Sequence, residues 1–168
     1  MRKKCIDEAM YNHEPPGYDC PFCFLVKCEA DLQPGNQPAE VIYYSKLVTA
    51  ILALGRWPKN PVDILVVPNE HFENLYDLPP EYATPLHQLT RATALALKSV
   101  YHCDGISTRQ HNEPAGGQDV WHYHVHVTPR FTDDGFYGSS RIEFPETERT
   151  EHAKQLRNYI ATHIAELF

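Results

Sequence analysis

Three histidines occupy alternate positions in the segment WHYHVHVTPR, residues 121–130. Because successive side chains of a β-strand point to opposite faces, His122, His124 and His126 would share one face, with Cα atoms roughly 7 Å apart. A row of imidazoles on one face can bind a metal ion, or can hold one histidine as a nucleophile toward phosphorus. The interleaved residues would face a hydrophobic core; they are Trp121, Tyr123, Val125 and Val127.

Three interpretations of this row stay open on the residues alone. The histidines could lie on a half-exposed strand without a function. They could bind a metal in a small β-barrel, although such sites commonly add a glutamate three or four residues later, and residues 128–131 contain no carboxylate. Finally, a neutral imidazole could attack phosphorus and form a covalent phosphohistidine-type intermediate, which divides one difficult step into two. The attacking nitrogen must then be unprotonated, so the other ring nitrogen should donate to a fixed acceptor.

A second candidate for chemistry is the pair Cys20 and Cys23 in the segment CPFC. It could be a redox pair, but that motif normally follows an apolar strand and opens a helix, and the preceding NHEPPGYD has no strand pattern. It could instead be half of a tetrahedral zinc site, which needs four cysteine or histidine ligands. Cys5, Cys28 and Cys103 are scattered and are expected to be plain thiols.

The elements that must position these residues follow from the spacing of apolar side chains. Residues 1–19 predict a polar N-terminal arm, and residues 20–168 a single domain that includes a C-terminal helix. Helices are expected from Pro79 to about Val100 and from Glu146 to Phe168. These helices and a cluster of strands predict the α+β class with a mainly antiparallel sheet. The expected strands are Val41–Tyr44, Leu47–Leu54, Ile64–Val67, Ile106–Gln110 and Val120–Val127, the first two joined by a hairpin at Ser45-Lys46.

Composition limits the classes of partner. The formal net charge of -7 argues against binding to a nucleic acid polymer or an anionic membrane, both of which need a basic face. A small phosphate-containing ligand stays possible, because backbone N–H groups can bind one locally. No apolar run approaches the ~20 residues of a membrane span, and Met1-Arg-Lys-Lys has no apolar stretch behind it. We therefore expect a cytoplasmic protein.

Several segments together resemble the histidine triad (HIT) superfamily of nucleotidyl hydrolases and transferases. HYHVHVTPR matches its hallmark, ILVVPNEH (64–71) its strand-Pro-x-x-His segment, LYDLPPE (75–81) its helix start, and HNEPAGGQDV (111–120) the loop before the triad. The match covers roughly residues 20 to 131. The resemblance implies a five-stranded antiparallel sheet with two main helices, and a homodimer whose sheets continue into one another.

The resemblance also implies roles for individual residues. His124 is expected to be the nucleophile, and His126 to contact the phosphate or help orient it. The loop 112–118 is expected to bind phosphate through residues Asn112, Gly117 and Gln118. A zinc-containing bacterial branch of the family implies a structural zinc ion bound by Cys20, Cys23, His71 and His122. On this view Pro129 ends the hydrogen-bond ladder of the triad strand.

The chain departs from the family pattern at three positions. Ala53 stands where many members have an acidic or amide residue that binds the ribose hydroxyls. Asp119 stands where many have serine or threonine; it could donate a proton to the leaving group if protonated, or it could cap a turn. His111 is an alternative to Asn112, because the loop is one residue shorter than in many members.

The function that these residues predict is a nucleotidyl hydrolase or transferase acting on a phosphoanhydride or phosphoramidate, with His124, His126 and Asp119 as catalytic residues. The alternative is a catalytically weak HIT-fold protein that binds or senses a nucleotide. A metal-dependent lyase or oxygenase is a third possibility.

Overall fold

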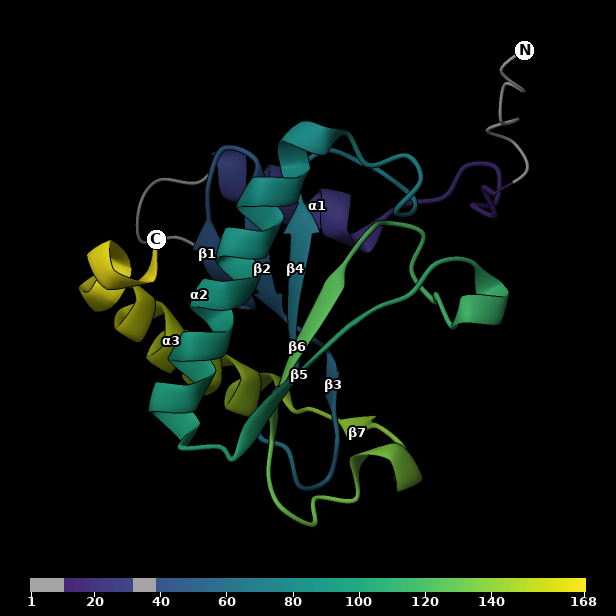
Figure 1. Cartoon of the computed structure of the whole chain (residues 1–168). Helices are drawn as coiled ribbons and strands as arrows, with labels where there is room; N and C mark the ends of the chain where they lie inside the picture. The colour runs from purple at the N-terminus through teal and green to yellow at the C-terminus, as the bar shows by residue number, and fades with distance from the viewer. Residues whose placement is uncertain (1–10, 32–38) are drawn as a thin grey trace, which may run out of the picture.

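The computed structural model describes residues 11–31 and 39–168 of the chain, and the elements fall into the α+β class that the sequence predicts. Five strands form one antiparallel sheet in the order β1-β2-β4-β6-β5 (Figure 1). Three α-helices and a short two-stranded sheet, β3 with β7, surround it. The helices are α1 (Pro21–Asp31), α2 (Ala83–Tyr101) and α3 (Glu146–Leu167); the strands are β1 (Val41–Tyr44), β2 (Val48–Leu52), β3 (Gly55–Arg56), β4 (Ile64–Pro68), β5 (Gly105–Gln110), β6 (Val125–Arg130) and β7 (Ile142–Glu143).

The register of the sheet determines which side chains lie beside His126. His126 pairs with Leu65 of β4 on one side and with Arg109 of β5 on the other. Leu65 in turn pairs with Ile51 of β2. Because directly paired residues point to the same face, His126 projects from the sheet between an apolar side chain and an arginine.

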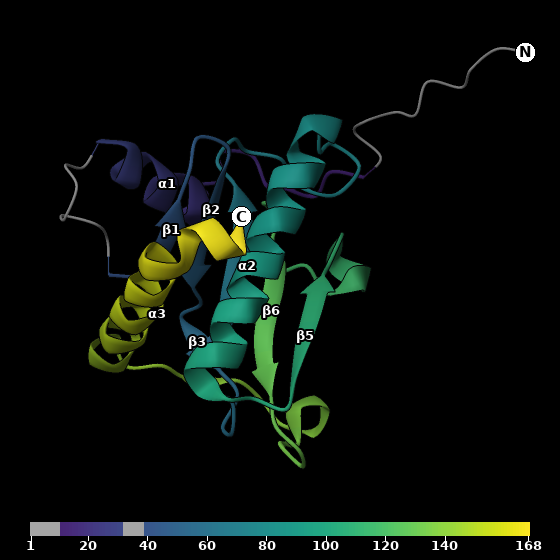
Figure 2. The same ribbon diagram turned by 60° about the vertical axis from the view of Figure 1, so that its left-hand side comes forward.

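The two faces of the sheet are covered by different helices (Figure 2). Helices α2 and α3 cover one face and bury the larger core, and the shorter α1 covers part of the other. A fully buried leucine or isoleucine contributes about 2 kcal/mol of burial free energy, so both clusters fix the strands that carry the histidines. The residues of the smaller cluster under α1 are Phe22, Val26, Val41, Ile51, Ala53, Leu65 and Val67.

The periodicity of α2 is confirmed, and that of α3 is confirmed in part. In α2, residues at steps of three and four, namely Leu86, Leu89, Thr93 and Leu97, are buried within the predicted helix. In α3, Ala153, Leu156, Ile160 and Leu167 are buried, but Ile164 is 46% exposed. The helix leaves helical geometry at His163, which turns Ile164 away from the core.

The predicted strand Val120–Val127 is wrong in position. Strand β6 begins at Val125, so His122 and His124 precede the ladder. Pro129 does not end the strand, because it pairs with Ile106 of β5. At this position β4 no longer flanks β6, so the missing N–H of proline leaves no hydrogen bond to β4 unmade. Among the interleaved residues, Tyr123 and Val127 are buried in the core, whereas Trp121 stacks on His13 with ring centroids 6.0 Å apart.

Helix α1 and strands β3 and β7 were not predicted. Helix α1 begins directly after Cys20, where the sequence indicated only a short apolar piece. Strands β3 and β7 pair with each other at the lower end of the sheet in Figure 1, outside the five strands that the sequence predicts.

Within the predicted arm, the structure describes residues 11–19. The backbone N–H groups of His13 and Glu14 donate to the Glu73 carboxylate at 2.5 and 3.2 Å, which ties this segment to the chain after β4. Residues 1–10 with Cys5, and residues 32–38 of the predicted loop, lie outside the described residues. In the part of the chain that is described, no helix has the length and apolar character needed to cross a membrane.

Candidate functional site

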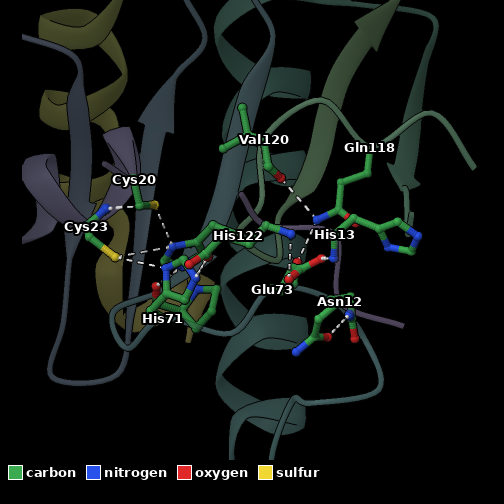
Figure 3. Close-up of polar contacts among 12 residues, drawn as sticks. Asn12, His13, Cys20, Cys23, His71, Glu73, Gln118, Val120 and His122 are labelled. Atoms are coloured by element: carbon green, nitrogen blue, oxygen red, sulfur yellow. Dashed lines mark hydrogen bonds and ion pairs between the residues drawn. The ribbon is translucent and has the colours of Figure 1, made fainter. Parts of the chain in front are cut away.

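Two cysteines and two histidines meet where α1 begins, beside the end of β4 (Figure 3). The Cys20 Sγ lies 3.2 Å from His122 Nδ1, and the Cys23 Sγ lies 3.3 Å from His71 Nδ1. All four candidate ligand atoms lie within 4.8 Å of one another. Zn–S bonds of about 2.3 Å and Zn–N bonds of about 2.0 Å require ligand atoms about 3.3–3.8 Å apart in a tetrahedron. The donor set and its spacing therefore fit a four-coordinate metal ion.

Both histidines of this cluster are oriented by a partner on the opposite ring nitrogen. His71 Nε2 lies 2.7 Å from the Glu14 carboxylate, and His122 Nε2 lies 3.0 Å from the carbonyl of Pro68. Donation from each Nε2–H leaves the lone pair on Nδ1, which faces the thiols. Burial lowers the pKa of His122 to about 3, so its imidazole is neutral, as a metal ligand must be.

A redox role for the cysteine pair does not fit. Burial, together with the neighbouring Cys20 thiol, raises the pKa of Cys23 to about 12, whereas a reactive redox cysteine needs a lowered pKa. The motif does open helix α1, but no strand precedes it in residues 11–20, the described part of the chain before the helix. The geometry favours metal binding.

His124 lies at the centre of the site and is 2% exposed. Its Nδ1 lies 2.7 Å from the backbone carbonyl of His122, which accepts the proton of that nitrogen. Burial lowers the pKa of His124 to about 4, more than the carbonyl contact raises it, so the ring is neutral. The tautomer that donates from Nδ1 leaves a lone pair on Nε2. His124 thus has the fixed acceptor that an imidazole nucleophile requires.

His126 is held by a carboxylate that the sequence reasoning missed. Asp63, directly before β4, is fully buried, and its Oδ2 accepts from His126 Nδ1 at 2.9 Å while its Oδ1 accepts from the Thr128 hydroxyl at 2.6 Å. Arg141 donates to the same Oδ2 at 2.7 Å. Burial alone would raise the pKa of Asp63, but these hydrogen bonds and the arginine charge lower it below its usual value. The ionised Asp63 fixes the ring orientation of His126.

A cavity of about 960 Å³ opens beside these histidines, in the size range of pockets that bind small ligands. One wall is apolar and comes from α1 and the sheet, with Phe22, Ile51, Ala53 and Leu65 among its residues. The polar residues include His124, His126, Asp119 and Arg141. An apolar wall facing a few polar groups is suited to a ligand with a flat ring and a phosphate.

Asn112 and Gln118, which are predicted to bind phosphate, have amides that are hydrogen-bonded within the chain in this structure. The Asn112 Oδ1 accepts from the N–H of Leu75 at 2.8 Å, and its Nδ2 donates to Gln110 at 3.0 Å. Both amide hydrogens of Gln118 are taken, by the carbonyl of Glu73 at 2.6 Å and that of Val120 at 3.0 Å. Neither residue lines the cavity. Their amides hold the loop in place.

Gly117 is likewise bonded within the loop. Its N–H donates to the carbonyl of Pro114 at 3.0 Å, inside the loop, and Gly117 does not line the cavity. Its φ of +88° requires a glycine, because an L side chain is strained there. His111, the alternative to Asn112, does approach the triad, since its ring centroid lies 5.9 Å from that of His126.

Asp119 lines the cavity and is exposed. Within residues 11–31 and 39–168 its carboxylate accepts no hydrogen bond from the backbone N–H of a turn, so the turn-capping interpretation has no support. Asp119 is close enough to His124 for its negative charge to favour the protonated ring. Its side chain is therefore placed where it can act on a ligand at His124.

The geometry agrees with the comparison to known families. The model of the HIT domain matches residues 34–133. The chain belongs to the HIT family.

Members of this HIT family in several organisms are similar to the chain. "Protein hit" of Bacillus subtilis is 26% identical over 147 residues, covering 88% of this chain and 95% of that protein. The purine nucleoside phosphoramidase of Escherichia coli is 30% identical over 91 residues, covering 54% of this chain and 75% of the enzyme. The crystal structure of a zinc-bound histidine triad family protein from Mycobacterium smegmatis superposes with a TM-score of 0.70 at 28% identity, over 88% of this chain and 97% of that chain.

Proposed function

We propose that this HIT protein is a nucleotidyl hydrolase or transferase that attacks a phosphoanhydride or phosphoramidate with His124. The observation that carries the proposal is the orientation of His124: its Nδ1 is bound to a backbone carbonyl, its ring is neutral, and it lines a cavity of nucleotide size. The phosphoramidase of Escherichia coli supports the choice of substrate class.

The proposed reaction has two displacements at phosphorus. The Nε2 lone pair forms a P–N bond, and the bond from phosphorus to the bridging oxygen or nitrogen breaks, with its electron pair leaving on the departing group. Water, or another acceptor, then attacks phosphorus, loses a proton, and the P–N bond breaks to return the lone pair to Nε2. His126, oriented by Asp63, is positioned beside the phosphate; with both ring nitrogens protonated it would donate to Asp63 from Nδ1 and to a phosphoryl oxygen from Nε2, and loss of one such donor costs about 3 kcal/mol in well-studied enzymes.

We further propose that the cluster of Cys20, Cys23, His71 and His122 binds a structural zinc ion. The closed set of four protein ligands and the zinc-bound relative support this role. A bound zinc would tie α1 to the segment that carries His124. For the oligomer we propose a homodimer in which a sheet edge at β1 or β5 continues into the partner, and for the location the cytoplasm.

The test of the function is a substrate panel of purine nucleoside 5′-phosphoramidate, 5′-phosphosulfate and dinucleoside polyphosphates in water enriched in oxygen-18. We expect release of nucleoside monophosphate that carries solvent oxygen, with kcat above about 1 s⁻¹ on at least one substrate. Mass spectrometry should detect a nucleotidyl adduct on the peptide that contains His124. Tight binding of nucleoside monophosphate without any turnover would instead support the nucleotide-sensor alternative.

Replacement of Asp119 by asparagine tests the proposed proton donor. If Asp119 protonates the leaving group, the variant should lose about 10²-fold in kcat on an amine leaving group, which needs a proton, and little on sulfate, which does not. The ratio of the two rates is the measurement, because a change in folding would lower both. Equal rates for variant and wild type on both substrates would remove Asp119 from the mechanism.

A further inference from the structure

Arg141 reaches the cavity from a part of the chain outside the residues that match the HIT domain, which end at residue 133. It stands directly before β7, and β7 pairs with β3 through Gly55 and Arg56. The absence of a side chain at Gly55 lets the backbone of β7 approach closely, because a Cβ there would lie 3.3 Å from the carbonyl oxygen of Ile142. The small β3–β7 sheet, at the lower end of the main sheet in Figure 1, therefore carries a cation to the cavity that holds His124.

The guanidinium of Arg141 is fixed but not enclosed. It donates to the buried Asp63 at 2.7 Å and lies over the ring of Trp57, with its Cζ 4.8 Å from the ring centroid. Its side chain is nevertheless 36% exposed, whereas that of Asp63 is 0% exposed. Asp63 is the one acceptor recorded for Arg141 among the described residues, so most of its N–H donors remain for a ligand.

A second arginine, Arg109, adds positive charge close to Asp63, although it does not line the cavity itself. Arg109 lies between Trp57 and Phe136, with its Cζ 4.7 and 4.6 Å from their ring centroids. Its Nε and Nη2 are buried and have no acceptor within the part of the chain that is described. Two guanidinium groups thus face the single carboxylate of Asp63.

The neighbouring carboxylate does not cancel this charge. Glu40 also lines the cavity, but its Oε1 is paired with Arg149 at 3.2 Å. The Arg141 guanidinium is paired with Asp63 on one side only, and its remaining N–H groups can bind phosphate, because a planar guanidinium fork matches two phosphate oxygens.

The position of Arg141 relative to the triad is given by a chain of contacts. The rings of His124 and His126 have centroids 5.0 Å apart, and His126 and Arg141 both bind the same oxygen of Asp63. A bound ligand whose phosphorus lies at His124 would therefore extend alongside His126 to reach Arg141.

We propose that Arg141 forms a second anion site in this cavity, which binds a second phosphate group of the nucleotide whose reacting phosphorus lies at His124. The inference rests on the proposed nucleotide function. The second phosphate can come from the ribose, as in a 2′,5′- or 3′,5′-bisphosphate, or from the chain, as in a 5′-diphosphate. In each case Arg141 would bind a phosphate group other than the one that reacts at His124.

Calorimetric titration of the full-length protein with four nucleotides tests this site. The ligands are adenosine 5′-monophosphate as the reference, adenosine 5′-diphosphate, and the 2′,5′- and 3′,5′-bisphosphates. In the wild type at least one ligand with a second phosphate should bind about tenfold or more tightly than the monophosphate, as expected for one added charge-assisted bidentate contact. A preference for the diphosphate places the second group in the chain, and a preference for a bisphosphate places it on the ribose.

Variants at Arg141 decide whether this residue is responsible. Arg141→Gln should remove the preference, with the affinity for the monophosphate little changed, and Arg141→Lys should keep part of it, because a point charge remains. Arg56→Gln is the matched control, since Arg56 lies in the adjacent strand but does not line the cavity. Loss of the preference in Arg56→Gln as well would assign it to general charge and contradict the proposal.

The site fails if no second phosphate improves binding in the wild type, or if Arg141→Gln keeps the preference. These results are separate from the proposed catalysis. Turnover of the substrate panel without a preference would remove the anion site and leave the hydrolase. A preference without turnover would keep the anion site and remove the hydrolase.

Discussion

The His124→Gln variant is expected to lose about 10⁴-fold or more in kcat on every substrate that the wild-type protein turns over. The glutamine amide can still donate to the carbonyl of His122 and fills part of the imidazole volume, so the buried environment is largely kept. It has no nitrogen lone pair that can attack phosphorus, and no covalent adduct can form. Steady-state kinetics and mass spectrometry of the quenched reaction measure both consequences.

Two other histidines provide the comparison. His126→Gln keeps the nucleophile but loses the ring that Asp63 orients, so an intermediate loss of about 10²-fold is expected. His152 packs on Phe144, with ring centroids 5.7 Å apart, and does not line the cavity, so His152→Gln should leave kcat unchanged. If His124→Gln kept more than about a tenth of the wild-type kcat, His124 would not be the nucleophile.

The sheet and helix α2 could be predicted because their sequence patterns have a single structural solution. Residues Ile64–Pro68 are all buried, as a continuous apolar run between turn residues indicates for a central strand. The steps of three and four residues in α2 fit only a helix with one buried face. In both cases the signal is the same local period that determines burial.

The triad segment shows where such a pattern misleads. Polar and apolar residues alternate from Trp121 onward, which predicts a strand, but the backbone there makes other hydrogen bonds. The N–H of His122 donates to Val120 at 2.8 Å, and that of Tyr123 to Phe72 at 2.6 Å. These bonds direct His122 toward the cysteines. The ligand set itself was implied by the family resemblance, and the periodicity could not supply it.

Asp63 and Arg141 were missed because neither belongs to a pattern. Asp63 is one acidic residue beside the apolar run ILVVP, and its importance depends on Thr128 and His126, more than 60 positions away. The one available signal was a carboxylate next to a strand expected to be buried, since a buried charge needs partners. For Arg141, no local signal existed: only the β3–β7 pairing brings it to the cavity.

Removal of the metal is expected to destabilise the protein strongly, by about 3–5 kcal/mol, which corresponds to roughly 10 °C in Tm for a chain of this length. Purified wild type should contain zinc, and treatment with a chelator should lower its Tm by that amount. Cys20→Ala and Cys23→Ala should each lose the zinc and reproduce the change, because each removes one of four ligands. Differential scanning calorimetry and elemental analysis measure the two effects.

Cys103→Ala is the matched control, because Cys103 is a buried free thiol outside the cluster. It should keep its zinc, and chelation should lower its Tm as much as that of the wild type. The physical reason for a large effect is local: α1 contacts the sheet through a few apolar residues such as Phe22 and Val26, while two of its anchoring side chains are thiols. A metal with a catalytic role would behave differently, since chelation would then abolish turnover while the Tm stayed close to its original value. That result would exclude the structural zinc and reopen a metal-dependent reaction.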